Sequence, residues 1–298
     1  MPRVVIAGCG FVGLVTARVF HLAGWETLGL THSQESAASL KGEPFPVASC
    51  DISDADAVRG LAARIGAGPD AVIHCASSGR GGADAYRSVY LEGTRNLLDA
   101  FVPARLLFTS STSVYAQTDG ALVDECSPAE PPRETGRLLR ETEELVLARG
   151  GIVARLAGIY GPGRSVLLRK FFSGDAVIEG DGGRIVNQIH RDDIASALHI
   201  LIERQATGIY NVSDDAPMPQ HEIYARLAQR FALPLPPGGP IDPNRKRGWT
   251  SKRVSNAKLR ALGWQPGFGS FFDAIEREPE LVIAARHAAH ADPPSPLL

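Results

Sequence analysis

Three glycines near the start of the chain have the spacing of a phosphate-binding turn. The apolar run at residues 4–7 leads directly into Gly8, Gly10 and Gly13, and a helix-spaced apolar pattern follows. In such a unit the first glycine makes a tight turn, the second lets the backbone approach a pyrophosphate, and the third lets the helix pack on the strand. The phosphates bind unpaired N–H groups at the helix N-terminus, so we expect a bound dinucleotide. The residues expected to hold it are Gly8, Gly10, Phe11, Val12 and Gly13.

Polar and small residues also follow the other apolar runs of the first half of the chain. If these runs are parallel strands, their carboxyl ends meet at one edge of a sheet, where doubly wound folds bind ligands. The residues concerned are Thr31, His32 and Ser33, then Asp51 and Ile52, then Cys75, Ala76 and Ser77, and finally the stretch 109–115. We therefore expect these side chains to face the same ligand as the glycine turn.

The elements that would position these residues alternate along the first half of the chain. Strand-like runs lie near 3–8, 26–30, 46–50, 71–75, 104–109 and 152–156, and helical patterns lie near 11–23, 54–65, 84–101 and 134–149. This alternation predicts an α/β protein with a Rossmann-type, doubly wound parallel sheet and helices on both faces. Beyond residue 158 the elements are shorter and are broken by glycines, which predicts a smaller C-terminal substrate lobe.

The domain organisation follows from this change in pattern. We expect residues 1–163 to form the dinucleotide-binding core and residues 164–285 to form the substrate lobe, which is interleaved with the last core elements at 185–212. The chain from Ala284 onward is rich first in Ala and His and then in Pro. This composition predicts a frayed end, with residues 286–298 as a flexible tail.

Charge and composition argue against several classes of partner. The 298 residues carry a formal net charge of -2, so neither nucleic acid nor an anionic membrane surface is expected. The basic cluster at 244–247 is interpreted either as a solvated face or as an anion clamp at the pocket mouth. No apolar stretch reaches bilayer length and the start has the pattern of a strand rather than a secretory signal, which favours a cytoplasmic protein. The cysteines lack ligand spacing, so neither a metal site nor a disulfide is expected.

Several short stretches, taken together, resemble one family: the extended short-chain dehydrogenases/reductases, in the epimerase/dehydratase branch. They occur in family order at residues 8–13, 51–52, 74–77, 92–97, 110–115, 159–164, 190–195 and 210–213. The resemblance implies a nicotinamide dinucleotide cofactor and a small-molecule substrate, with sugar nucleotides among the candidates. It also leaves open a homodimer built from the helices at 84–101 and 134–149.

The resemblance implies roles for single residues as well. Asp51 would hydrogen-bond the adenine amine, residues 75–77 would line the nucleotide path, and Ser111 would hydrogen-bond the reacting oxygen of the substrate. Two of these roles have a structural alternative. Asp51 begins a run that is also typical of a helix cap, and the Ser111 hydroxyl at a strand end can be satisfied by the backbone.

Two departures from the family pattern concern the cofactor. Extended members have G-x-x-G-x-x-G, whereas this chain has the shorter spacing of ordinary Rossmann proteins. Where the family has an acidic residue for the adenosine ribose, this chain has Thr31, followed by His32 and Ser33. A carboxylate would repel a 2′-phosphate, whereas these side chains can donate hydrogen bonds to one. We therefore expect NADP in preference to NAD.

A larger departure concerns the proton chemistry. Thr135 and Leu139 replace the family's Tyr-x-x-x-Lys pair, although Gly136 and Glu143 stay in register. The tyrosine is normally the general acid/base and the lysine lowers its pKa, which neither threonine nor leucine can reproduce. Arg140 lies about 100° round the helix from Leu139, and a guanidinium stays protonated. We therefore expect Leu139 to pack inward and the usual pair to be absent.

Other side chains are candidates for the missing proton donor. Tyr115 ends the hydroxyl-rich run, and Tyr160 lies in the loop that flanks the substrate in the family. Tyr90 stands where the family has Asn, and it either fills space or points into the site. His190 is interpreted as a structural residue that precedes a helix capped by Asp192.

Two functions are compatible with these residues. The first is an NAD(P)-dependent epimerase/dehydratase or reductase that acts on a sugar-like or nucleotide-sugar substrate with an atypical proton donor. The retained Ser111 and the loop around Tyr160 favour it. The second is a non-catalytic NADP-binding sensor or a protein that docks on a partner, which the missing Tyr/Lys pair favours. Between the two, the sequence favours the enzyme.

Overall fold

A parallel sheet of seven strands lies at the centre of the computed structural model, which describes residues 1–66, 68–79, 81–242 and 248–290. The strands are β1 (Arg3–Ala7), β2 (Glu26–Thr31), β3 (Val47–Ser49), β4 (Ala71–His74), β5 (Arg105–Ser111), β7 (Ile152–Leu156) and β12 (Gly208–Val212). Their order is β3-β2-β1-β4-β5-β7-β12, with every neighbouring pair parallel. The chain thus winds outward in both directions from β1, which puts the ligand-binding switch point between β1 and β4. The predicted α/β class and doubly wound sheet are confirmed.

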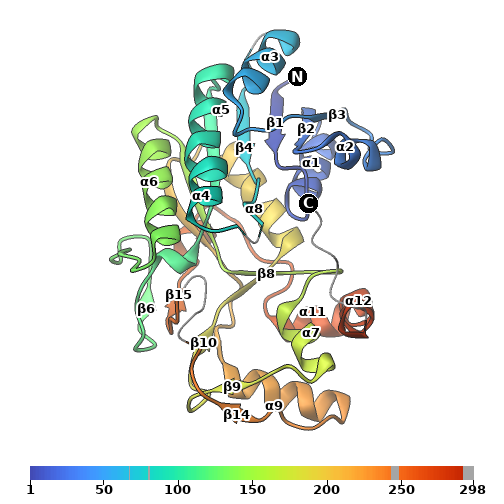
Figure 1. Ribbon diagram of the computed structural model, residues 1–298, viewed down its shortest axis with the longest axis vertical. Coiled ribbons are helices and arrows are strands. Elements are labelled where there is room, and N and C mark those ends of the chain that lie inside the picture. Colours follow the sequence, from blue (N-terminus) through green and yellow to red (C-terminus); the bar gives the residue numbers. More distant parts are fainter. Residues whose placement is uncertain (67, 80, 243–247, 291–298) are drawn as a thin grey trace.

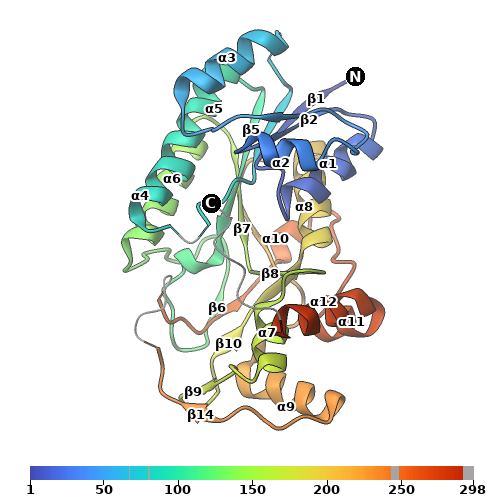
Figure 2. The same ribbon diagram turned by 45° about the vertical axis from the view of Figure 1, so that its right-hand side comes forward.

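Helices cover both faces of this sheet (Figures 1 and 2). One face carries α1 (Gly13–Leu22) and α8 (Arg191–Glu203), and the other carries α3 (Ala55–Ile65), α5 (Gly93–Phe101) and α6 (Glu134–Ala148). The short helix α2 (Gln34–Ser39) links β2 to β3. Successive residues of β1 enter opposite cores, with Val4 on the α1 side and Val5 on the α5 side. Burial on both faces explains why β1, β4 and β7 are nearly continuous apolar runs in the sequence.

The C-terminal lobe, below the sheet in Figure 1, has an apolar core of its own. Its helices are α7 (Val166–Ser173), α9 (Gln220–Phe231), α11 (Phe271–Arg277) and α12 (Pro279–His290), while α10 (Ala257–Arg260) packs near β12. Short strands connect them: β8 (Gly158–Tyr160), β9 (Ile178–Glu179), β10 (Ile185–Val186), β11 (Gln188–His190), β13 (Met218–Pro219), β14 (Gly238–Gly239) and β15 (Arg253–Val254), which pairs with β6 (Leu122–Val123). Aromatic side chains, among them Tyr160 and Phe271, dominate this core.

The helix predicted at 84–101 is divided into three parts. It consists of α4 (Ala83–Tyr86), a π-helical turn η1 (Arg87–Glu92) and α5. A π-turn is wider than an α-turn, and such turns are frequent at functional sites. Gly93 then starts α5 against Ile52, where an added Cβ would lie 3.0 Å from Cδ1 of that side chain. The simple helical periodicity of the sequence does not reveal this interruption.

Two further predictions are corrected by the structure. Helix α8 begins at Arg191 and its cap is His190, whose side chain accepts the N–H of Asp192, so Asp192 is not the cap. Helix α12 continues to His290 because Leu281 is buried in the lobe core, so the expected frayed end is wrong for residues 284–290. Residues 291–298 and the basic cluster at 244–247 lie outside the described residues.

Among the described residues, no helix combines the length and the apolar composition that a membrane span requires.

Candidate functional site

The glycine turn is built as tightly as its spacing predicts. Gly8 has φ +92°, and an added Cβ would lie 2.3 Å from the Ala76 backbone. At Gly13 an added Cβ would lie 2.1 Å from the Gly8 carbonyl oxygen, so only glycine lets α1 come this close to the turn. At Gly10 an added Cβ would meet nothing within 4 Å. Two of the glycines therefore shape the turn. At Gly10 no side chain blocks the close approach of a ligand, while its own N–H donates to the Gly8 carbonyl at 2.8 Å.

A pocket of about 450 Å³ lies in front of this turn, along the carboxyl ends of the central strands. Its volume is in the range of small-molecule sites. The predicted site residues that line it are Gly8, Gly10, Phe11, Val12, Thr31, His32, Asp51, Ile52, Cys75, Ala76, Ser77 and Ser111. Residues from widely separated parts of the sequence are thus brought together around one cavity, as the parallel arrangement of the strands predicts.

Gly13 and Ser33 are predicted site residues that do not line the pocket. Gly13 is buried behind the turn, at the start of α1. Ser33 is the N-cap of α2, where its hydroxyl accepts the N–H of Ser36 at 3.2 Å. Ser36 itself lines the pocket, one turn further along α2. Ser36 was not among the predicted site residues, although its spacing from a helix-capping serine indicates its place on the first turn of α2.

Asp51 lies at the end of the pocket where the chain leaves β3. Its Oδ1 accepts hydrogen bonds from the N–H and the hydroxyl of Ser53, at 2.9 and 2.7 Å. The N-cap of α3 is instead Asp54, which bonds two N–H groups of the first turn. The alternative of Asp51 as helix cap is therefore wrong. His32 lies across from Asp51, with Nδ1 3.6 Å from Oδ1, so a base and an acid share this end of the pocket.

Ser111 lies at the other end of the pocket, where β5 ends. Its Oγ accepts the N–H of Ser113 at 3.2 Å and so caps a short 3-10 turn, η2 (Thr112–Val114). The backbone alternative is thus correct, but Ser111 also lines the pocket. A hydroxyl can accept one hydrogen bond and donate another, so both roles are compatible.

The wall next to Ser111 is apolar at Leu139, the position at which the family resemblance predicts a lysine. Leu139 is buried and lines the pocket from α6, which confirms that it packs inward. Arg140 instead forms ion pairs with Glu143 and with Glu144 on the same helix. Thr135 is buried one turn before Leu139. No lysine takes part in lining the pocket within the described part of the chain.

Beneath this wall lies a buried ionic cluster centred on Glu143. Arg155 donates to both carboxylate oxygens, at 3.0 and 2.6 Å, and Ser110 donates to Oε1 at 2.6 Å. Glu143 and Arg155 are almost completely buried, so the Arg155 charge depends on Glu143 for compensation, while Glu143 also pairs with Arg140. Because Ser110 lines the pocket, the cluster connects the pocket floor to α6 and β7. The family glutamate thus remains although its neighbouring lysine has been replaced.

The structure contradicts the prediction of Tyr115 as a proton donor. Its side chain is fully buried, and its hydroxyl donates to Asn211 Oδ1 at 2.9 Å. The Arg155 guanidinium lies 4.8 Å from the ring centroid. Burial raises the pKa of Tyr115, and the residue does not line the pocket. The turn η2 directs its side chain into the core instead of toward the ligand.

Tyr160 is corrected for a similar reason. It lies in the core of the C-terminal lobe, with its ring edge-to-face against His190 and Phe271. Its hydroxyl faces the Ser270 carbonyl at 3.5 Å. Burial, together with nearby carboxylates such as Asp214, raises its pKa far above the ordinary range. Tyr160 is therefore a structural residue of the lobe, outside the pocket lining.

Tyr90, which the sequence left open, faces the pocket. It lies in the π-turn η1, is 6% exposed, and lines the cavity together with Ser111 and Leu139. Its hydroxyl accepts the N–H of Ser78 at 3.4 Å. Its ring packs against His74, with 6.2 Å between the centroids, and against neighbouring aromatic rings that hold its direction. Of the tyrosines considered, Tyr90 alone is a pocket residue.

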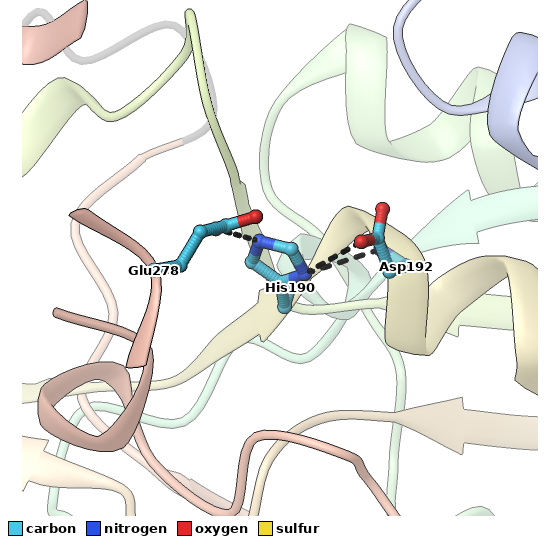
Figure 3. A group of neighbouring side chains, drawn as sticks. All are labelled: His190, Asp192 and Glu278. Atoms are coloured by element: carbon cyan, nitrogen blue, oxygen red, sulfur yellow. Dashed lines mark hydrogen bonds and ion pairs between the residues drawn. The ribbon is translucent and has the colours of Figure 1, made fainter. Parts of the chain in front are cut away.

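His190, Asp192 and Glu278 form a further titratable group (Figure 3). His190 Nε2 lies 3.0 Å from Glu278 Oε2, and its Nδ1 accepts the backbone N–H of Asp192 at 3.3 Å. Both ring nitrogens are therefore used in hydrogen bonds, which leaves no lone pair for a metal ion. Burial lowers the pKa of His190 to about 4. The group joins β11 to the start of α12 and is structural, as the sequence predicted for His190.

A doubly wound sheet with a glycine turn at its switch point defines a Rossmann-type dinucleotide-binding protein. The family model that matches residues 4–213 describes the NAD dependent epimerase/dehydratase family. Protein YeeZ of Escherichia coli K12 is 31% identical over 252 residues, which are 79% of this chain and 86% of YeeZ.

Two further comparisons extend over nearly the whole chain. A 3-diazoavenalumate denitrifying reductase of a Streptomyces species is 28% identical and covers 93% of this chain and 100% of the reductase. A solved structure from Methylobacillus flagellatus, provisionally described as an NAD-dependent epimerase/dehydratase, is 28% identical with a TM-score of 0.77. It covers 96% of this chain and 99% of that structure.

The chain belongs to the NAD-dependent epimerase/dehydratase family. It is accordingly an oxidoreductase/epimerase-like enzyme of a family that depends on NAD. The residues present fit such a cofactor, because Gly10, where no side chain blocks a ligand, and the start of α1 form a phosphate cradle inside the pocket.

Proposed function

We propose that this protein is an NAD(P)H-dependent reductase of a carbonyl group in a sugar-like substrate, sugar nucleotides included. The observation that carries the proposal is the composition of the pocket. One cavity joins the glycine turn to the hydroxyls of Ser111 and Tyr90, and it presents Leu139 where the family has lysine. The full-length similarity to a protein named as a denitrifying reductase supports a reductive reaction in general.

The apolar Leu139 favours reduction over oxidation for a simple reason. Oxidising an alcohol requires a base that removes the hydroxyl proton, whereas reducing a carbonyl requires only an acid that gives one. A phenol carries a proton that it can donate, and a neighbouring cation is what would favour its use as a base instead. Leu139 provides no such cation. The pocket therefore provides the acid that a reductase needs, whereas Leu139 does nothing to make it a base, so an epimerase or dehydratase is the weaker alternative.

Each residue of the reacting end then has a defined task. A bound dihydronicotinamide would supply the hydride for the carbonyl carbon. Ser111 Oγ donates a hydrogen bond to the carbonyl oxygen, and the Tyr90 hydroxyl delivers a proton to that oxygen as negative charge develops on it. Leu139 and Val89 line the same wall and exclude water from the reacting atoms. The Ser78 N–H holds the Tyr90 oxygen through its lone pair, so its proton remains directed elsewhere.

We further propose that NADP is preferred over NAD. The end of β2 carries no carboxylate, and the exposed His32 and the Ser36 hydroxyl at the pocket edge are available as hydrogen-bond donors. Thr31 contributes less than the sequence suggested, because its hydroxyl donates to the Ser33 carbonyl at 3.1 Å. The preference is tested by the dissociation constants of NADPH and NADH. Tighter binding of NADH would contradict it.

The proposed activity is tested with purified protein, NADPH and a panel of keto sugar nucleotides and small carbonyl compounds. Oxidation of NADPH above the rate without substrate is the expected result, and the corresponding alcohols should reduce NADP much more slowly at neutral pH. If NADPH binds with micromolar affinity and no member of the panel is turned over, the non-catalytic sensor or docking protein becomes the better hypothesis.

A homodimer stays a prediction. The outer face of α6 is charged, with Arg137, Glu141 and Glu144 exposed. A helix face of this kind forms a dimer only through complementary charges on the partner copy. Sedimentation velocity at low and high salt tests this arrangement, because salt should dissociate such a dimer.

A further inference from the structure

Two arginines from the second half of the chain lie over the ring of Phe11 in the glycine turn. The Arg164 guanidinium carbon is 5.4 Å from the ring centroid, and that of Arg191 is 5.0 Å from it. Both distances are in the range of cation–π contacts. Arg164 also lines the pocket together with Gly10, Phe11 and Val12. Positive charge thus lies beside the N–H groups expected to hold the phosphates.

The two arginines are held differently. Arg191 lies at the start of α8, and its Nη1 donates to the Pro162 carbonyl at 3.2 Å. Gly161 packs on its stem, where an added Cβ would lie 3.0 Å from Arg191 Cδ and Cγ. Gly161 and Arg164 exchange two backbone hydrogen bonds, each of 2.9 Å, which closes the loop tightly. Arg191 therefore supports the loop, and the loop presents Arg164 at the pocket.

We infer that Arg164 binds the pyrophosphate of the dinucleotide next to the glycine turn, and that Arg191 is a positioning residue for it. Arg191 also pairs with the Asp192 carboxylate, with its Nε 3.4 Å from Oδ1, so an anion within α8 already compensates its charge. The Arg164 guanidinium instead lines the pocket at the glycine turn, where the diphosphate of a bound dinucleotide would lie. A guanidinium binds phosphate oxygens in pairs, whereas the turn offers single N–H groups. This inference rests on the proposed cofactor site and adds to it a contact from outside the Rossmann half of the chain.

The diphosphate of a sugar nucleotide has the same chemistry as that of the cofactor. The location of Phe11 within the glycine turn favours the cofactor, because Arg164 contacts the ring beside Gly10. The two sources are separated by probes that carry only one of them. ADP-ribose contains the cofactor's pyrophosphate without nicotinamide, adenosine contains no phosphate, and UDP-glucose represents the substrate side.

The experiment measures the dissociation constants of NADPH, NADH, ADP-ribose, adenosine and UDP-glucose by calorimetry. The proteins compared are the wild type, Arg164→Gln, Arg164→Lys and, as a matched control, Arg169→Gln. Arg169 is exposed on α7, outside the pocket lining. Melting temperatures establish that each variant is folded.

Arg164→Gln should weaken the binding of NADPH, NADH and ADP-ribose about tenfold each, because a lost charged hydrogen bond has that effect. The binding of adenosine should stay unchanged. The dissociation constants of Arg164→Lys should fall between those of the wild type and those of Arg164→Gln. Those of Arg169→Gln should match the wild type. Added salt should weaken dinucleotide binding by the wild type more than binding by Arg164→Gln. Unchanged dinucleotide binding in Arg164→Gln, or a loss confined to UDP-glucose, would overturn the inference.

Arg191 is tested by a double-variant cycle. If Arg191 acts through the loop, Arg191→Gln alone should weaken NADPH binding. Added to Arg164→Gln, it should have little further effect on that binding. Additive losses would contradict the positioning role. A wild type that binds no dinucleotide at all would instead refute the proposed function, so the two failures are distinguishable.

Discussion

The two ends of the pocket differ in whether the backbone or the side chains determine their properties. At the nucleotide end the geometry resides in the backbone, and Gly8 and Gly13 accept no side chain without a clash. At the reacting end the chemistry resides in side chains, and Leu139 occupies the place of a lysine without disturbing α6. A site built from backbone is therefore constrained by the fold, whereas a site built from side chains can change its reaction while the fold persists.

Removing Glu143 gives the largest expected effect on the reacting end. Glu143→Ala leaves the buried Arg155 without its partner, and breaking a buried pair costs about 3–5 kcal/mol in the free energy of unfolding. Glu144→Ala is the matched control, because its pair with Arg140 is on the surface and is worth less than about 1 kcal/mol. Urea denaturation measures both. Equal losses in the two variants would show that the buried cluster does not support this end.

Two glycine substitutions test the nucleotide end. Gly13→Ala places a Cβ 2.1 Å from the Gly8 carbonyl, so we expect a loss of stability of about 1–3 kcal/mol. Gly10→Ala meets no protein atom, so its stability should stay near that of the wild type while NADPH binding weakens at least about tenfold. Melting curves and binding titrations separate the two effects. Normal NADPH binding by Gly10→Ala would argue against a phosphate at this position.

Tyr90→Phe tests the proton donor. Removing a general acid lowers the rate about 100-fold or more, so kcat should fall by that factor while the dissociation constant of NADPH changes little. Tyr115→Phe is the contrast, since its hydroxyl bonds Asn211 inside the core. That variant should lose about 1 kcal/mol of stability and keep its kcat within about twofold. The reverse outcome would restore Tyr115 as the donor.

The smallest effect is expected at the adenosine edge of the pocket. His32→Asp adds a carboxylate where a 2′-phosphate would lie, so NADPH should bind about tenfold more weakly while NADH is nearly unaffected. Isothermal titration with both cofactors measures the ratio. Parallel weakening of both cofactors would mean that residue 32 does not face the 2′ position.

The sequence predicted the centre of the sheet well because β1, β4 and β7 are buried on both faces and are therefore nearly continuous apolar runs. The residues that end the strands could be assigned to the pocket because parallel strands bring their carboxyl ends together. Thr31, Asp51 and Ser111 illustrate this.

Side-chain direction could not be obtained in this way. Tyr115 lies four residues beyond Ser111, but the 3-10 turn between them directs it into the core. Tyr160 was placed at the substrate by the family pattern, yet its ring belongs to the lobe core that α11 completes more than a hundred residues later. The direction of Tyr90 depends on a π-turn, which helical periodicity does not distinguish from an ordinary turn.

Because Tyr90 lies in the π-turn η1, the position of its hydroxyl depends on the number of residues in this turn as well as on the residue type. A π-turn contains one residue more than a regular helix needs, so deleting Leu91 or Glu92 would restore the α-helical repeat. The flanking helices α4 and α5 would keep their relative direction, because the π-turn accommodates the very residue that the deletion removes, but the residues inside the turn would shift by one position. Tyr90 would leave the pocket without being mutated, and a different side chain would take its place. Relatives that differ by a single insertion here could therefore share this fold and this cofactor and still perform different chemistry.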